Sequence, residues 1–288
     1  MKTCRGMMYA MMIALAGCGS SEKSADNVND NTAGAKPPMA VQLWSVRDAL
    51  TADFDGTLAA IADMGFDGIE IYPELGPYKD DAVGLRARLD TLGLKVSSAH
   101  VPLEALSAEL LPTTVDFYRT IDVSTLIIAW DDRAWDPDRI DALVTDLNAA
   151  AERLAAFDMR IGYHNHDGEF GDYAGATFWD YLAKRTDPSV LLQLDVGWVV
   201  NAEKDPASFI KRNPDRIISM HYKIMPREDQ DISPILGEDV TDWAALTDLA
   251  QNTGGLQWVI VEQEVYPDGQ SPMNAVAASK AGLQRLLQ

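Results

Sequence analysis

From residue 40 onward, short apolar runs alternate with amphipathic segments, and this repeat constrains the fold more than any other feature. The runs are continuous rather than alternating, as in Leu126-Ile127-Ile128-Ala129, which is typical of parallel strands covered by helices. Between them, spacings such as Leu143, Leu147 and Leu154 are typical of helices. The predicted strands are Ala40–Trp44, Gly68–Tyr72, Lys95–His100, Thr125–Trp130, Arg160–His164, Val190–Leu194, Ile217–His221 and Trp258–Glu262.

Eight strands with intervening helices over about 250 residues predict one α/β domain, a single (β/α)8 TIM barrel at residues 39–288. An open, doubly wound sheet is the alternative. It is disfavoured because no predicted strand leads into a Gly-rich phosphate turn of the G-x-G-x-x-G type.

Composition excludes several classes of protein. The chain has 288 residues, 47% of them hydrophobic, and a net charge of -20, so it is neither disordered nor suited to binding nucleic acid. Its two cysteines, Cys4 and Cys18, both precede the predicted barrel. A disulfide framework, a cysteine nucleophile and a thiolate metal site are therefore excluded for the barrel.

The N-terminal segment resembles an export signal. Lys2 and Arg5 precede an apolar run that is too short to span a bilayer and that ends in Leu15-Ala16-Gly17-Cys18, similar to the lipobox of bacterial lipoproteins. We expect a signal peptide at residues 1–17 and a flexible tether at 18–38 that begins with lipidated Cys18. By resemblance to enteric sorting signals, Gly19 favours the periplasmic face of the outer membrane, with the lipid as the membrane contact. The alternative is an ordinary signal peptide.

Polar residues cluster at the carboxyl ends of the predicted strands, where TIM barrels keep their chemistry. All four histidines lie there, a placement that ordinary surface or core histidines would rarely give. His164, Asp195, His221 and Glu262 fall one on each of the last four strands. Two imidazoles and two carboxylates suit one divalent ion, Mn2+, Zn2+, Co2+ or Mg2+. A buried charge network is the alternative.

Other strand-end residues are candidates for binding a small carbohydrate. Trp44, Trp130 and Trp198 offer flat surfaces for a sugar ring, although packing explains them equally well. Glu70 is a candidate for a hydrogen bond to substrate or to a ligand. Lys223 shares a strand face with His221, because side chains alternate with period two, and is a candidate for holding a hydroxyl or stabilising an oxyanion.

These motifs resemble the xylose-isomerase-like TIM-barrel superfamily, in its sugar phosphate isomerase/epimerase branch. The resemblance runs from about residue 40 to the C-terminus. It rests on residues 65–70 (GFDGIE), 163–170 (YHNHDGEF), 194–198 (LDVGW) and 261–264 (VEQE).

The resemblance implies a metal-dependent enzyme whose ligands are Glu, Asp, His and Glu. Asp195, His221 and Glu262 match the last three of these, while His164 stands where the epimerases have glutamate. It further implies substrate-binding roles for Arg227, six residues after His221, and for Glu169.

The expected activity is isomerisation or epimerisation of a sugar by proton abstraction next to a carbonyl, with Glu262, His166, His100 and Lys223 as candidate catalytic groups. The export signal and the lack of a phosphate-binding loop favour a non-phosphorylated substrate.

Three alternatives remain. One is a lyase that eliminates water or a glycosidic oxygen, because His164 replaces a carboxylate base and its segment is similar to that of inosose dehydratases. The second is a sugar-binding lipoprotein without catalysis. The third, a DNA-cleaving enzyme like the apurinic endonucleases of the superfamily, is disfavoured by the acidic charge and the small number of histidines.

Overall fold

The computed structural model describes Met1, residues 36–227 and residues 230–288. Cys18 and, apart from Met1, the predicted signal peptide at 1–17 lie outside the described residues, as does the tether up to residue 35. Within the described part of the chain, no helix is both long and apolar enough to cross a membrane.

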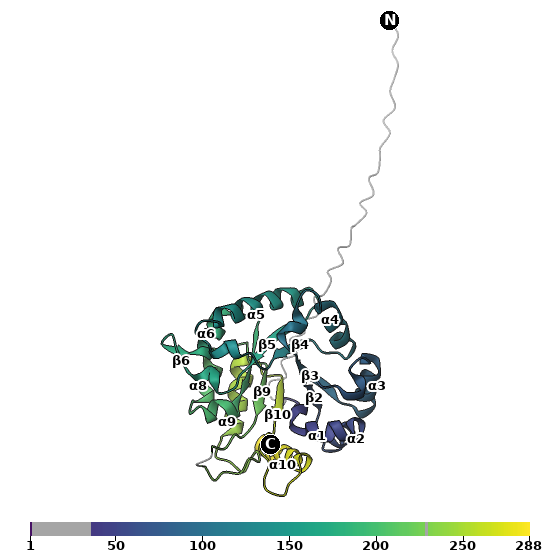
Figure 1. The fold of residues 1–288 in the computed structure, drawn as a ribbon, viewed down its shortest axis with the longest axis vertical. Coiled ribbons are helices and arrows are strands. Elements are labelled where there is room, and N and C mark those ends of the chain that lie inside the picture. The colour runs from purple at the N-terminus through teal and green to yellow at the C-terminus, as the bar shows by residue number, and fades with distance from the viewer. Residues whose placement is uncertain (2–35, 228–229) are drawn as a thin grey trace. The chain divides into compact units, whose positions relative to one another are not determined.

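Eight parallel strands close into a barrel (Figure 1), which confirms the predicted (β/α)8 fold. Each strand pairs with its neighbours in parallel, and the closure joins the first strand to the last. In their order around the barrel the strands are β1 (Met39–Gln42), β10 (Trp258–Val261), β9 (Ser219–Tyr222), β8 (Leu191–Asp195), β5 (Arg160–His164), β4 (Thr125–Ile128), β3 (Lys95–His100) and β2 (Gly68–Ile71).

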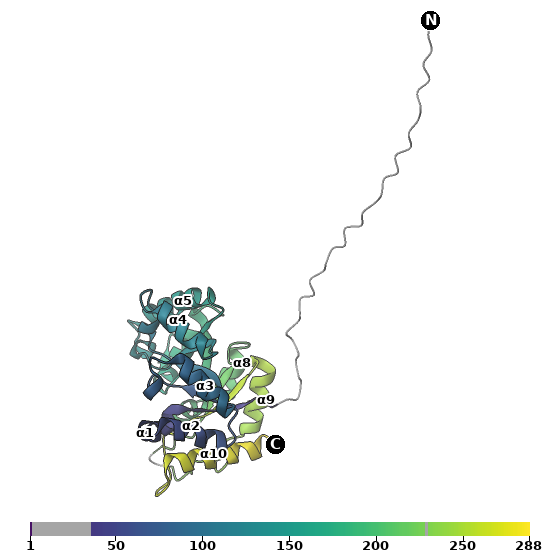
Figure 2. The same ribbon diagram turned by 90° about the vertical axis from the view of Figure 1, so that its right-hand side faces the viewer.

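Helices surround this barrel in both views (Figures 1 and 2). They are α1 (Arg47–Ala52), α2 (Phe54–Asp63), α3 (Ala82–Leu92), α4 (Leu111–Thr120), α5 (Ile140–Ala155), α6 (Phe178–Arg185), α7 (Val196–Asn201), α8 (Pro206–Arg212), α9 (Trp243–Gly254) and α10 (Pro272–Leu286). Helix α10 lies beside α1 and α2, so the first and last units of the barrel are neighbours. A short hairpin of β6 (Asp172–Tyr173) and β7 (Ala176–Thr177) precedes α6.

Local chemistry sets where the elements begin and end. The strand predicted at Ala40–Trp44 stops at Gln42, because the Gln42 side chain accepts a hydrogen bond from the Trp44 amide and starts a 3-10 turn at Leu43–Val46. Strand β8 instead extends to Asp195, which caps α7. Short capping side chains at a helix start satisfy amides that have no partner within the helix.

The register of the strands brings polar side chains to one end of the barrel. Asp195 is paired with His221 across β8 and β9, and His164 with Gln193 across β5 and β8. Elsewhere around the barrel, Gln42 of β1 is paired with Glu70 of β2. Because all the strands are parallel, their carboxyl ends meet at this rim and can build one site.

Candidate metal centre

The four predicted ligands lie together at the carboxyl end of the barrel. One ligand atom from each of His164, Asp195, His221 and Glu262 lies within 4.8 Å of all the others, and all four residues are buried. Nε2 of His164 and Nδ1 of His221 are each 3.8 Å from Oδ2 of Asp195, and His221 Nδ1 is 2.8 Å from Oε2 of Glu262. The distances between these donors suit a single divalent ion with bonds of about 2 Å.

Hydrogen bonds fix the position of Asp195 and involve only one of its two carboxylate oxygens. Its Oδ1 accepts a hydrogen bond from the Trp198 amide at the start of α7. Its backbone N–H donates to Oδ1 of Asn165, and its carbonyl accepts from Nδ2 of the same side chain. Oδ2 is buried and accepts no hydrogen bond, and the ammonium of Lys223, 3.1 Å away, balances its charge. Asn165 carried no signal of this role in the sequence.

Glu70 is a buried acceptor beside this group. Its carboxylate accepts hydrogen bonds from Gln42, Ser98, Gln193 and His221. Burial opposes ionisation, but His100 and His221 outweigh it and hold the pKa of Glu70 well below its usual value. Gln193 and Gln42 were not predicted from the sequence, although Gln193 stands two residues before Asp195 and therefore on the same strand face.

Lys223 forms ion pairs with three carboxylates at this end of the barrel. Its Nζ lies 3.0 Å from Oε2 of Glu262, 3.1 Å from Oδ2 of Asp195 and 3.4 Å from Oε2 of Glu264, and its side chain is 1% exposed. Burial opposes its charge, but these carboxylates raise its pKa above the ordinary value. Lys223 Nζ also lies 4.8 Å from the centre of the Trp198 ring.

The protonation of the two candidate histidine ligands differs. Burial, reinforced by the neighbouring histidines, lowers the pKa of His164 well below its usual value, so its ring is neutral and keeps a lone pair. Burial also opposes the charge on His221, but Glu70 and Glu262 raise its pKa to about 10.

The residues present fit a divalent ion. The donor set mixes imidazole and carboxylate, and Asp195 Oδ2 within it accepts no hydrogen bond and has the ammonium of Lys223 as its ion-pair partner. An ion bound by these groups would replace the proton on Nδ1 of His221. It would also lie close to the positive charge of Lys223, which contacts the same two carboxylates. His100 extends the cluster, because ligand atoms of His100, His164 and His221 also lie within 4.8 Å of one another.

Aromatic side chains pack in a row beside the candidate metal ligand His164. His166 lies between Trp130 and Trp198, with ring centres 4.9 Å and 5.5 Å away, and its ring centre is 5.1 Å from that of His164. Trp130 is 62% exposed, whereas Nδ1 of His166 and Nε1 of Trp198 are buried without a hydrogen-bond partner. Burial lowers the pKa of His166 to about 4, so its ring is neutral at physiological pH. Trp44, 39% exposed, packs against Tyr72.

Two residues that the resemblance assigned to substrate lie in other surroundings. Glu169 is fully buried and accepts hydrogen bonds from the Tyr163 hydroxyl and the His166 amide, so it fastens the loop after β5. Burial raises its pKa to about 7. Arg227 forms an ion pair with the exposed Glu203 beyond α7. Neither belongs to the two groups of candidate metal ligands described above.

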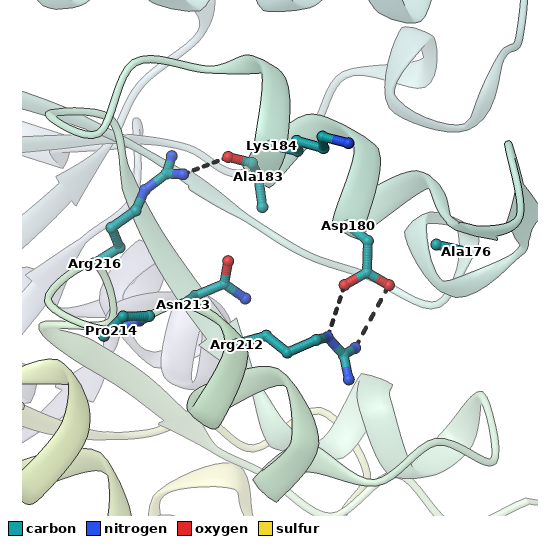
Figure 3. Close-up of a pocket in the computed structure, with 8 residues that line it drawn as sticks. All are labelled: Ala176, Asp180, Ala183, Lys184, Arg212, Asn213, Pro214 and Arg216. Atoms are coloured by element: carbon teal, nitrogen blue, oxygen red, sulfur yellow. Dashed lines mark hydrogen bonds and ion pairs between the residues drawn. The ribbon is translucent and has the colours of Figure 1, made fainter.

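A separate groove on the outside of the barrel contains none of the candidate residues. It has a volume of about 660 Å³ and lies between α6 and α8 (Figure 3). Arg212 crosses it to pair with Asp180, and Arg216 donates to the Ala183 carbonyl. These contacts occupy Asp180, Arg212 and Arg216, and the residues that line the groove include none from the carboxyl end of the barrel.

Comparison with known proteins gives consistent results. Residues 58–287 match the family model described as "xylose isomerase-like TIM barrel". An inosose dehydratase from Lacticaseibacillus casei is 24% identical over 266 residues, covering 79% of this chain and 87% of that protein. One from Lactiplantibacillus plantarum is 24% identical over 191 residues, covering 59% and 62% of the two chains.

Solved structures share the fold. A sugar phosphate isomerase/epimerase from Parabacteroides distasonis superposes with a TM-score of 0.71 at 22% identity, covering 89% of this chain and 97% of that one. An L-ribulose 3-epimerase superposes with a TM-score of 0.67 at 18% identity, covering 87% and 94%.

Proposed function

The chain belongs to the xylose isomerase-like TIM barrel family, and from that premise we propose that it is a carbohydrate enzyme dependent on one divalent metal ion. The observation that carries the proposal is the buried group of His164, Asp195, His221 and Glu262, in which Asp195 Oδ2 has no hydrogen bond. An ion held there would act as a Lewis acid that polarises a substrate carbonyl.

Proton abstraction next to that carbonyl is the step we assign to the protein's own groups. Neutral His166, with its unpartnered Nδ1, is a base at the edge of the cluster. Glu262 is the ionised carboxylate of the centre, because Lys223 and His221 outweigh its burial and keep its pKa well below the usual value. Lys223 supplies positive charge where a substrate oxygen becomes negative.

Elimination of water or of a glycosidic oxygen is the outcome that we place first. His164 stands in the metal group where a second carboxylate base would be needed for symmetric inversion, since a lone pair used for a metal cannot accept a proton. The similarity to inosose dehydratases supports the same reaction class, a lyase acting on a keto-sugar or keto-inositol.

Isomerisation or epimerisation is the second candidate. It is supported by Glu264, a further carboxylate at the rim that could act as a second acid or base. Glu264 lies 3.4 Å from Lys223, and burial raises its pKa above the usual value. His166 would then remove a proton from one face of the carbon, and Glu264 in its protonated form would return a proton to the opposite face. Glu264 has a partly exposed side chain, as a group that meets substrate must.

We propose a non-phosphorylated substrate for either reaction. The chain carries a net charge of -20, and Lys223 is shared among three carboxylates, so a dianionic phosphate would meet repulsion at the rim.

The experiment is to incubate the Mn2+-loaded protein with keto-inositols and keto-sugars in D2O. We expect deuterium exchange at the carbon next to the carbonyl and an unsaturated product absorbing in the ultraviolet. Exchange with inversion and without the unsaturated product would select the second candidate. Neither exchange nor product, with sugar binding that is unchanged after chelation, would reject catalysis in favour of a binding protein.

We also propose that the protein is exported and anchored by lipid on Cys18 at the periplasmic face of the outer membrane. The support is the apolar run and lipobox-like Leu15-Ala16-Gly17-Cys18. Fractionation with Cys18→Ser as the comparison tests it, and membrane association that survives the substitution would reject the lipid anchor.

A further inference from the structure

We propose that Glu70 is a positioning residue that decides which ring nitrogen each candidate histidine ligand presents to the metal centre. It acts on His221 directly and on His164 through the amide of Gln193. This proposal rests on the proposed function, because it concerns the same metal centre.

The first step is that Glu70 can only accept hydrogen bonds. Its Oε1 accepts from Ser98 Oγ at 2.5 Å and from Gln193 Nε2 at 2.6 Å. Its Oε2 accepts from Gln42 Nε2 at 2.7 Å and lies 2.6 Å from Nε2 of His221. The residue is fully buried, so water does not substitute for any of these donors. An ionised carboxylate is the side chain that can accept on both oxygens without donating.

The second step is that Glu70 fixes the orientation of the Gln193 amide. Because Glu70 must receive a donor, the NH2 group of Gln193 points toward it and toward Ser219 Oγ, 3.0 Å away. The amide oxygen therefore faces the opposite side, where Nδ1 of His164 lies 3.0 Å from it. A carbonyl oxygen accepts only, so His164 carries its proton on Nδ1.

The third step is that the two histidines present different nitrogens. With its proton on Nδ1, His164 keeps a lone pair on Nε2, which lies 3.8 Å from Asp195 Oδ2. His221 has the opposite arrangement: its Nε2–H donates to Glu70, and its Nδ1 faces Glu262 at 2.8 Å and Asp195 at 3.8 Å. One acceptor on β2 thus orients ligands on β5 and β9.

Glu70 should therefore affect metal binding strongly, although it is not one of the four candidate ligands. A histidine ligand bonds through its unprotonated nitrogen, and the hydrogen bond made by the other nitrogen selects the tautomer. Loss of such a partner typically weakens metal binding roughly 10–100-fold. Glu70 supports two ligands at once, so its effect lies toward the upper end of that range.

The test is Glu70→Gln, which preserves shape but leaves one acceptor oxygen where two are needed. Either Gln193 or His221 then faces an NH2 group, so one histidine turns its proton toward the metal centre. We expect the dissociation constant for Zn2+, measured by competition with a chromophoric chelator, to rise roughly 10–100-fold. Gln193→Leu removes the acceptor of His164 and one donor to Glu70 but leaves the contact between Glu70 and His221 in place, so it should give a smaller rise.

Two variants control for disruption of a buried site. Glu169→Gln makes the same replacement at another fully buried glutamate, whose partners are Tyr163 and the His166 amide, and we expect unchanged Zn2+ affinity. The exchange variant Glu70→Gln with Gln193→Glu moves the carboxylate to position 193. There it accepts from His164, while the new amide at position 70 donates to it and keeps its oxygen for His221. We expect this double variant to regain affinity, whereas affinity as low as that of Glu70→Gln alone would overturn the proposal.

The second measurement does not need metal. Histidine-selective 15N NMR of the metal-free protein resolves the tautomers of four histidines. We expect His164 to carry its proton on Nδ1 in the wild type and to populate the Nε2–H form in Glu70→Gln. A wild-type His164 protonated on Nε2, or no change in tautomer and affinity in Glu70→Gln, overturns the proposal. A wild type with the expected tautomer that binds no Zn2+ would reject the metal-dependent function while leaving the orienting role intact.

Discussion

At the scale of single residues, the surroundings give three buried glutamates two different protonation behaviours. Glu70 accepts from several donors and stays ionised, and Glu262 is ionised beside Lys223 and His221. Glu169 accepts from one hydroxyl and one backbone amide, which do not offset the cost of burial, so its pKa rises to about 7. Residue type alone therefore does not assign a role.

Glu169→Gln should change how stability depends on pH. A carboxyl whose pKa is raised in the folded state keeps a proton that the unfolded chain releases, so wild-type stability falls as pH rises from about 4.5 to about 7 and levels off above that. Glutamine does not titrate, so the variant should gain stability relative to wild type by up to about 3 kcal/mol across this window. Urea denaturation at a series of pH values measures this.

A second variant is Asp167→Asn, which removes an exposed carboxylate two residues away that, together with burial, raises the pKa of Glu169. Its fall in stability over the same pH window should therefore be somewhat smaller than that of the wild type. A pH-independent difference between Glu169→Gln and wild type would mean that Glu169 is ionised in the folded protein.

The sequence predicted the candidate ligands because histidines and carboxylates at strand ends are conspicuous against apolar runs. His164, Asp195, His221 and Glu262 were all found in this way and lie together. The amides that support the ligands were not found, since asparagine and glutamine at a strand end have no spacing that separates a clamp from a solvated side chain. Asn165 and Gln193 became visible only through their contacts.

At the scale of elements, the ends of strands and helices were harder to predict than their presence in the chain. Strand β1 ends at Gln42 because a side-chain cap turns the chain, although the apolar pattern continues through Leu43 and Trp44. The apolar pattern records burial on the barrel or under a helix, and it does not separate a strand from the 3-10 turn that follows it. The sequence pattern also could not predict where the Arg227 side chain lies, because this depends on an ion pair with Glu203 in a different loop.

Helix α7 approaches β9 so closely that it tolerates only glycine at position 197. A Cβ atom added there would lie 2.7 Å from the backbone oxygen of Lys223 and 3.0 Å from its carbonyl carbon, so the backbone must shift. We expect Gly197→Ala to destabilise the protein by about 1–3 kcal/mol. We also expect it to weaken Zn2+ binding, because Asp195 caps the start of α7 and Lys223 lies two residues after His221, so a backbone shift would move both candidate ligands. Chemical denaturation and chelator competition measure the two effects.

Val200→Ala on the exposed face of α7 provides the comparison. It alters the same helix without touching β9, and its stability and Zn2+ affinity should stay near the wild-type values. If Gly197→Ala matched it in both measurements, the close approach of α7 to β9 would not constrain the site.

At the scale of the whole molecule, the candidate ligands come from one side of the barrel. His164, Asp195, His221 and Glu262 lie on or directly after β5, β8, β9 and β10, which are consecutive around the closed sheet. Without a cation, this arc holds two carboxylates whose charge is balanced mainly by Lys223 and His221. An ion bound by all four residues would link the four strands in the folded state only.

Metal binding should therefore raise the melting temperature of the barrel. A ligand at 100 times its dissociation constant that binds only the folded state adds about 2.7 kcal/mol, which corresponds to about 5–10 °C for a domain of this size. We expect calorimetry of the chelator-treated protein to show this rise on adding Mn2+ or Zn2+. Asp195→Ala should abolish it, because one carboxylate of the four-residue group is removed, whereas Glu264→Gln should retain it, because Glu264 lies outside that group. An equal rise in wild type and Asp195→Ala would place the stabilising ion elsewhere on the acidic surface.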